Sequence, residues 1–187
     1  YLYWNNTTSK WVVGSANITL GQNAGQTAQG TNAVALGNTA GNTNQGQYSI
    51  AIGSQAGQNN QGGSTGTDGY AVAIGYQAGQ YTQGFWAISL GNLAGQTSQG
   101  NSSIAIGVQS AQYSQGYEAI AIGNQAGRGY QGNQTVSVGY RAGQTNQSSN
   151  AIAIGNNAGN LYQGNQSIAI GINAGCLLYT SPSPRDA

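Results

Sequence analysis

The chain carries very little charge. Among 187 residues there are four Lys or Arg and three Asp or Glu, so charged residues make up 4% of the total. About 25% is typical of a soluble globular domain. His and Met are absent and the net charge is +1. A chain this neutral has no basic patch for nucleic acid or for an anionic membrane surface, so neither is a predicted partner.

The residues that most enzymes and metal sites need are also scarce. A single Cys excludes a disulfide framework and a Cys-based zinc site. Asp68, Glu118 and Asp186 are too scattered for a carboxylate pair or a calcium cage. Ser and Thr have no His to act as a base, and no Gly-Lys-Ser/Thr phosphate loop occurs. The sequence therefore predicts no enzymatic activity, no cofactor and no metal. Its apolar runs of four or five residues are far too short for a membrane span.

What the chain has instead is a repeat of sixteen residues, rich in the 32 glycines. Ala151-Ile152-Ala153-Ile154-Gly155 begins one unit, and the same pattern begins every other unit. The ten units start at Asn17, Ala33, Ser49, Ala71, Ala87, Ser103, Ala119, Thr135, Ala151 and Ser167; the third is six residues longer than the others. A unit this short cannot bury its own apolar side, so the repeats must stack on one another. We predict an all-β fold, a parallel β-solenoid of about ten sixteen-residue coils.

Each unit should contain one short strand at its start. Its second and fourth residues are large aliphatics, which in a strand point to the same face, and its β-branched residues disfavour a helix. We predict that this face forms the core, with these residues buried: Ile104, Ile106, Ile120, Ile122, Ile152 and Ile154. The small residues between them should then face a second wall or a sister chain, and the predicted self-association contacts are Ala73, Ala105, Ala121 and Ala153.

The rest of each unit consists mainly of glycines that favour turns and of Gln and Asn residues. Gly fills the fifth position in all ten copies, which indicates turns with positive φ or close backbone approach. Gln fills the thirteenth position of every complete unit. Identical amides about 4.8 Å apart can hydrogen-bond as a ladder. The predicted Gln ladder consists of Gln29, Gln45, Gln61, Gln83, Gln99, Gln115, Gln131, Gln147 and Gln163.

The two ends differ from the repeats. Residues 1–16 read as an aromatic hairpin around a polar turn, which would cap the first coil at residue 17 or link it to a preceding domain. Residues 17–175 are the solenoid. Residues 176–187 hold the one Cys and both prolines, and resemble translated adaptor read-through; a native Pro-rich linker is the alternative. Because no Met begins the chain, we expect a fragment of a longer polypeptide.

The sequence leaves two surface functions undecided, glycosylation and ice binding. Glycosylation sequons begin at Asn5, Asn6, Asn17, Asn101, Asn133, Asn146 and Asn165, although an Asn-rich chain produces many by chance. Thr recurs in the eleventh position at Thr27, Thr43, Thr97 and Thr145, but Tyr81 and Leu161 interrupt the regular array that ice binding needs.

The strand segments, such as Ser103–Gly107 and Ala151–Gly159, resemble the head repeats of trimeric autotransporter adhesins. That resemblance implies a left-handed β-roll of three chains exposed on a cell surface. The sixteen-residue period is longer than the repeat usual in that family. The repeats also resemble repeat proteins predicted from giant viruses, which would imply a virion or extracellular fibre. We therefore expect a homo-oligomeric, extracellular or surface fibre segment that assembles as a trimer or filament and has glycans or a host surface as further partners. The alternative is a monomeric solenoid that binds glycan or ice.

Overall fold

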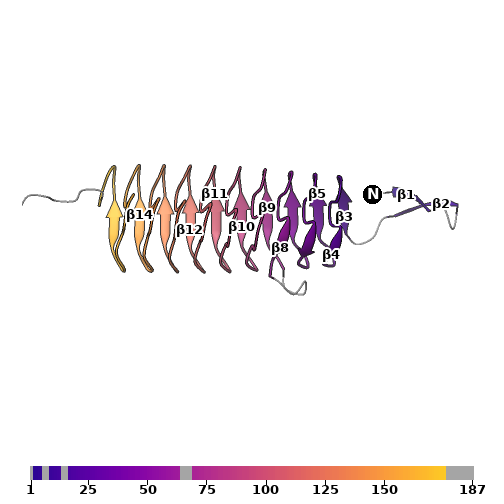
Figure 1. Ribbon diagram of the computed structural model, residues 1–187, viewed down its shortest axis with the longest axis horizontal. Coiled ribbons are helices and arrows are strands. Elements are labelled where there is room, and N and C mark those ends of the chain that lie inside the picture. Colours follow the sequence, from indigo (N-terminus) through magenta and orange to yellow (C-terminus); the bar gives the residue numbers. More distant parts are fainter. Residues whose placement is uncertain (1, 6–8, 14–16, 64–68, 176–187) are drawn as a thin grey trace, which may run out of the picture.

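The computed structural model describes residues 2–5, 9–13, 17–63 and 69–175, and it confirms the parallel β-solenoid (Figure 1). Within these residues there is no helix. Each coil contributes one three-residue strand to a single parallel sheet. In chain order the ten strands are β3 (Ile18–Leu20), β5 (Val34–Leu36), β7 (Ile50–Ile52), β9 (Val72–Ile74), β10 (Ile88–Leu90), β11 (Ile104–Ile106), β12 (Ile120–Ile122), β13 (Val136–Val138), β14 (Ile152–Ile154) and β15 (Ile168–Ile170).

The register of this sheet follows the repeat without a slip. Ile104 pairs with Ile120 and Ile106 with Ile122, so equivalent residues of successive coils lie beside one another. The longer third unit does not disturb the pattern, because Ile50 of β7 still pairs with Val72 of β9. The six extra residues therefore leave the register of the flanking strands unchanged.

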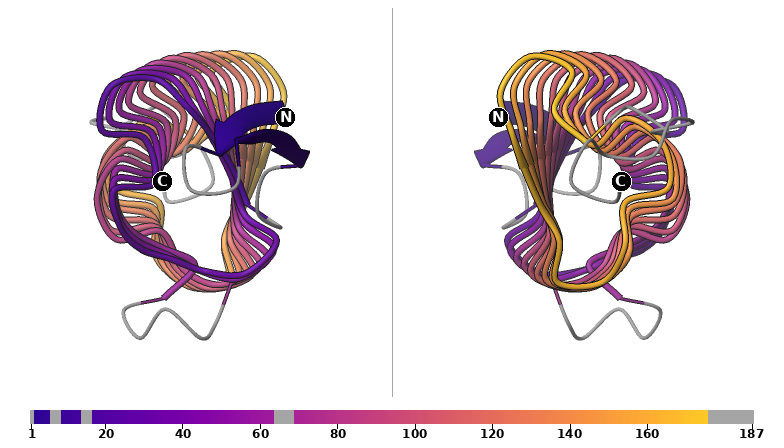
Figure 2. Two further views of the ribbon diagram at one scale, coloured as in Figure 1. Left: turned by 90° about the vertical axis from the view of Figure 1, so that its right-hand side faces the viewer. Right: turned by 90° about the vertical axis from the view of Figure 1, so that its left-hand side faces the viewer.

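A second wall of each coil holds the thirteenth position. At the N-terminal end it forms a three-stranded parallel sheet of β4 (Thr27–Gln29), β6 (Thr43–Gln45) and β8 (Asn59–Gln61). Further along, the same wall continues as single bridges between successive glutamines, from Gln61 and Gln83 onward to Gln131 and Gln147. Viewed end-on, the coils superpose into one closed outline that rotates slightly from coil to coil (Figure 2).

The corners of the coil depend on left-handed backbone. At the fifth position Gly107 has φ +125°, and a Cβ built there would lie 2.6 Å from the carbonyl oxygen of Gly123 in the next coil. Only glycine satisfies both constraints. Other corners place larger residues at positive φ, including Leu93 and Trp86, both at φ 58°. Stacking of the coils must hold these residues in a conformation that they seldom adopt alone.

The core lies on the side of the strands opposite to the predicted one. The alanines between the aliphatics are fully buried, as are those of the eighth position, such as Ala126 and Ala158. Of the residues predicted to be buried, Ile122 and Ile154 are 37% and 38% exposed. Ile104, Ile106, Ile120 and Ile152 are half-buried, so the predicted aliphatic core is wrong.

The narrowness of the coil explains this inversion. A Cβ built on Gly127, on the facing wall, would lie only 3.2 Å from the Cβ of Ala121. Side chains larger than Ala would overpack this space, so the small residues turn inward and the aliphatic residues turn outward. Because Ala73, Ala105, Ala121 and Ala153 are all 0% exposed, they cannot be self-association contacts as predicted.

The N-terminal strands β1 (Leu2–Asn5) and β2 (Lys10–Val13) pair with each other in antiparallel register, with Trp4 opposite Trp11. Whether the hairpin caps the solenoid stays a prediction. The residues 176–187, with their predicted read-through origin, lie outside the described residues.

Candidate functional site

The outward residues of the ten strands form a continuous aliphatic stripe, which we define as the second and fourth residues of every coil from Ile18 to Ile170. Neighbouring coils cover part of each side chain, so most of the stripe is half-buried. It remains exposed at Leu90 (41%), and more so at Ile168 (67%) in the last described strand. All of its members are Ile, Val or Leu, and none is charged. The stripe is therefore an apolar strip that runs the length of the sheet.

Inside the coils, the glutamines of the thirteenth position form one column. From Gln45 to Gln163 all are buried, and Gln29 in the first coil is half-buried. Each of the eight buried glutamines donates from Nε2 to a backbone carbonyl of its own coil's strand; Gln115 Nε2, for example, lies 2.9 Å from the oxygen of Ile104. The side chain thus crosses the coil and ties the second wall to the strand.

Bonds along the column are fewer than the ladder prediction implies. Gln29 donates to Gln45, Gln131 to Gln147 and Gln147 to Gln163, at 3.1 to 3.2 Å. Elsewhere Oε1 accepts from a serine, as at Ser89 to Gln99 (2.6 Å). Four Oε1 atoms have no partner at all, those of Gln61, Gln83, Gln115 and Gln131. The column therefore acts mainly as a set of cross-braces within coils.

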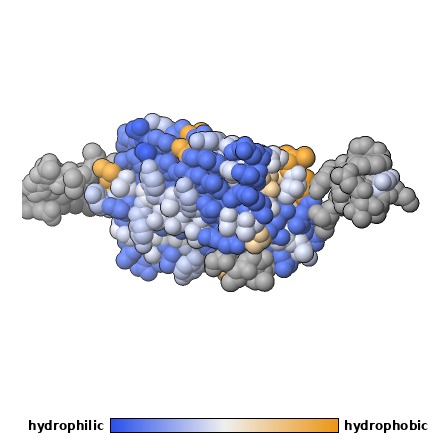
Figure 3. Space-filling view, turned by 45° about the vertical axis from the view of Figure 1, so that its right-hand side comes forward, coloured by the Kyte–Doolittle hydropathy of each residue, from blue (hydrophilic) through white to orange (hydrophobic). Residues whose placement is uncertain are grey.

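Two further amide columns lie on the outside, at the seventh and tenth positions. In the tenth, Gln96 Nε2 donates to Gln80 Oε1 at 3.1 Å, and Gln112 Nε2 donates to Gln96 Oε1 at 3.1 Å. The two columns are joined by a bond from Gln144 to Gln125 of 3.0 Å. Figure 3 shows a face of the molecule that is predominantly hydrophilic. This surface contrasts with the aliphatic stripe.

The tenth-position column is interrupted at Arg128. Arg128 Nε donates to Gln112 Oε1 at 3.0 Å, and its Cζ lies 5.8 Å from the ring centroid of Tyr113. On the other side, Gln144 Oε1, the atom that could accept from Arg128, accepts instead from Asn160 Nδ2 at 3.2 Å. The guanidinium is thus held by one coil and unconnected to the next.

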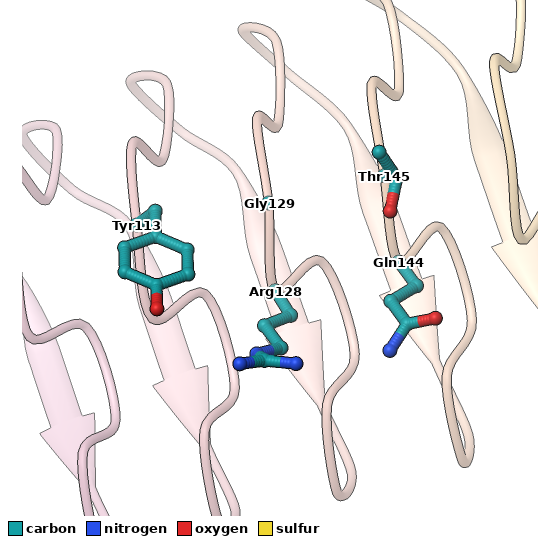
Figure 4. Close-up of a pocket in the computed structure, with 5 residues that line it drawn as sticks. All are labelled: Tyr113, Arg128, Gly129, Gln144 and Thr145. Carbon is teal, nitrogen blue, oxygen red and sulfur yellow. The ribbon is translucent and has the colours of Figure 1, made fainter.

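Beside this interruption lies an open hollow of about 370 Å³, lined by Tyr113, Arg128, Gly129, Gln144 and Thr145. Three successive coils supply these residues, and Figure 4 shows the guanidinium between the side chains of Tyr113 and Gln144. Gly129 occupies the eleventh position, where Thr97, Tyr113 and Thr145 carry side chains. Gly129 therefore leaves the eleventh-position column without a side chain in the lining of this hollow.

A second hollow of about 320 Å³ lies two coils further on, lined by Arg141, Asn157, Asn160, Leu161 and Asn173. Arg141 Nε donates to Gln125 Oε1 at 2.9 Å, and its Cζ lies 4.9 Å from the ring centroid of Tyr140. Both arginines of the described solenoid therefore lie on the outer amide surface. In the sequence, Arg128 is a break in the tenth-position column of amides, and Gly129 beside it is the signal that could have indicated a hollow.

The remaining predicted positions are scattered over the surface. Among the sequons, Asn146 and Asn165 are exposed, whereas Asn133 is half-buried and accepts from the backbone N of Tyr117 at 3.2 Å. Asn17 likewise accepts from the backbone of the next coil, while Asn101 is half-buried. Asn5 lies in β1 and Asn6 outside the described residues. Glycosylation stays a prediction.

Across the residues that the structure describes, no three His, Cys, Asp or Glu side chains gather so as to hold a metal ion. Nor do those residues include a helix long and apolar enough to cross a membrane.

Comparison with known proteins points to one family of repeats. No curated protein sequence and no solved structure matches the chain. The family model of the YadA head domain repeat does match, in two copies, at residues 27–40. Those residues include β5 and the preceding turn, in the same coil geometry that recurs throughout the solenoid. The chain is therefore a parallel β-solenoid in which residues 27–40 are similar to the YadA head domain repeat.

Proposed function

We propose that this chain is a structural segment of a surface-exposed, adhesin-like fibre and that it self-associates through its aliphatic stripe. The observation that carries the proposal is the stripe itself. Monomeric proteins seldom expose a continuous apolar strip of this length, and such strips mark interfaces. Ten strands about 4.8 Å apart give a strip on the order of 50 Å long.

A second copy of the same chain is the partner that fits best. Every coil presents the same pair of aliphatic side chains at the same spacing, so a second stripe matches the first coil for coil. The stripe carries no charge, so nothing on it opposes close approach of an identical face. This arrangement replaces the alanine contacts predicted from the sequence. Three chains around one axis, as the resemblance implies, would bury all three stripes together.

The similarity to the YadA head domain repeat supports a location outside the cell or on its surface. A virion surface is the alternative that the resemblance to giant-virus repeats implies. The uncharged, amide-rich outer surface suits a fibre that is built for length and contact and not for catalysis. The same features support the proposal that the chain is not an enzyme.

The test is light scattering on the full chain with the double variant Ile122→Asp and Ile154→Asp. Both side chains lie in the stripe and are more than a third exposed, so each coil should still fold. The matched control is Asn124→Asp with Asn156→Asp, which adds the same charge to exposed positions of the same two coils. We expect an oligomer for the parent and the control, and a monomer for the stripe variant. A monomeric parent, or a stripe variant that assembles like the control, would refute the proposal.

A further inference from the structure

We infer that the hollow at Gly129 is a binding site for an acidic sugar, in which the carboxylate of a hexuronate pairs with Arg128. The hollow lies on the outer amide surface and involves no residue of the aliphatic stripe. The inference is therefore independent of the proposed fibre, and a negative result for sugar binding would leave the fibre proposal unchanged.

Arg128 is positioned to bind an anion from outside the protein. Its Nε is tied to Gln112, a buried side chain 6% exposed, and its Cζ lies over the Tyr113 ring. The structure shows no bond from its two Nη atoms to any described residue. Because those two donors form a fixed fork that matches a carboxylate, the guanidinium is oriented in advance for a bidentate contact.

No acidic side chain of the described solenoid neutralises this cation. Glu118 belongs to the sixteenth position of its coil, and its Oε2 accepts from Gln134 Nε2 at 2.9 Å. The uncharged surroundings also mean that an anion near Arg128 meets no repulsion from a nearby carboxylate. The charge on the ligand should therefore be negative.

The other lining groups favour a sugar over a simple carboxylic acid. Tyr113, which is 46% exposed, supplies an aromatic wall, while Gln144 and Thr145 supply an amide and a hydroxyl on the opposite side. Such groups hydrogen-bond to ring hydroxyls in either direction. A hollow of about 370 Å³ also falls within the range of small-molecule sites, roughly 300–1,000 Å³.

The repeat itself provides variants that should fold. Arg128→Gln places at the tenth position the residue that Gln112 and Gln144 have there, and so removes the charge alone. Gly129→Thr places at the eleventh position the residue found at Thr97 and Thr145, and so adds a side chain to the lining of the hollow while keeping the charge. A Cβ at Gly129 would approach the Gln144 carbonyl oxygen at 3.1 Å, which small local movement can relieve.

The experiment titrates the full chain with trigalacturonate and with its methyl ester, measured by calorimetry at an ionic strength of about 0.15 M, where the Debye length is about 8 Å. We expect the acid to bind and the ester to bind at least roughly tenfold more weakly, because the ester keeps the rings but loses the charge-assisted contact. Arg128→Gln and Gly129→Thr should each weaken binding of the acid by a similar factor. Arg141→Gln, which removes the same charge at the neighbouring hollow, should have an effect of less than about twofold.

The site is overturned if trigalacturonate does not bind, if its methyl ester binds as well, or if Gly129→Thr leaves binding unchanged. Equal losses in Arg128→Gln and Arg141→Gln would also overturn it, since they would indicate diffuse attraction to positive charge. Acetate distinguishes the carboxylate from the sugar: binding as tight as that of trigalacturonate would contradict the role of Tyr113 and Thr145. Light scattering should give the same oligomeric state for all three variants, so the binding results do not test the fibre proposal.

Discussion

The glycine column at the fifth position offers the sharpest test of the fold, through the substitution Gly107→Ala. Gly107 has φ +125°, where an alanine costs about 1–3 kcal/mol in backbone strain. The new Cβ would also lie 2.6 Å from the oxygen and 2.8 Å from the carbonyl carbon of Gly123. Displacing that backbone should add about 1–3 kcal/mol, the usual cost of overpacking. We expect a total loss of roughly 2–6 kcal/mol in the free energy of unfolding.

The chain contains its own control for this substitution. Gly171 has φ +120°, but a Cβ built there would have no atom of the described residues within 4 Å. Gly171→Ala should therefore cost the strain alone. At roughly 2–4 °C per kcal/mol for a chain of this size, thermal melting followed by circular dichroism should separate the two variants by several degrees. Equal melting temperatures for Gly107→Ala and Gly171→Ala would refute the close contact between stacked glycines.

Three more predictions follow from the inverted core and the corners. Ala121→Asp should unfold the chain or cost several kcal/mol, because it buries an unpaired charge. Ile122→Asp should change the melting temperature of the isolated chain much less. The reverse order of the two variants in thermal melting would contradict an alanine core. Gln115→Leu should cost about 1–3 kcal/mol in urea unfolding through the loss of two donor contacts to backbone carbonyls, and an unchanged midpoint would argue against cross-bracing. Leu93→Asn should stabilise the chain by up to about 1 kcal/mol, since Asn tolerates positive φ better than Leu does; a lower urea midpoint would show that the Leu93 side chain matters more than its backbone.

Much of the architecture could be predicted from the repeat alone. The period of sixteen residues predicts stacked coils, and the spacing of Ile104 and Ile106 predicts a strand in each coil with both side chains on one face. The invariant glycines predict tight corners, and the structure gives Gly107 the positive φ that they imply. These features are local or strictly periodic, so one sequence is enough to reveal them.

The hollow at Gly129 could not be predicted in this way. Its lining comes from three coils. Its shape depends on which eleventh-position residues carry a side chain and on the orientation of the Arg128 side chain. In sequence, Arg128 is only an exception in a column of amides. Once the coils are stacked, Tyr113 and Thr145 come to lie on either side of the glycine.

By itself the sequence determined that this protein is a stack of short parallel strands with regular corners and a column of glutamines. Only the tertiary structure decided which face of each strand is inside. Alternation in a strand separates Ile122 from Ala121 but does not say which of them meets the opposite wall. That choice depends on the width of the closed coil, which leaves room for a methyl group and not for an isoleucine. The same narrowness turns the aliphatic residues outward, where they are available to another chain.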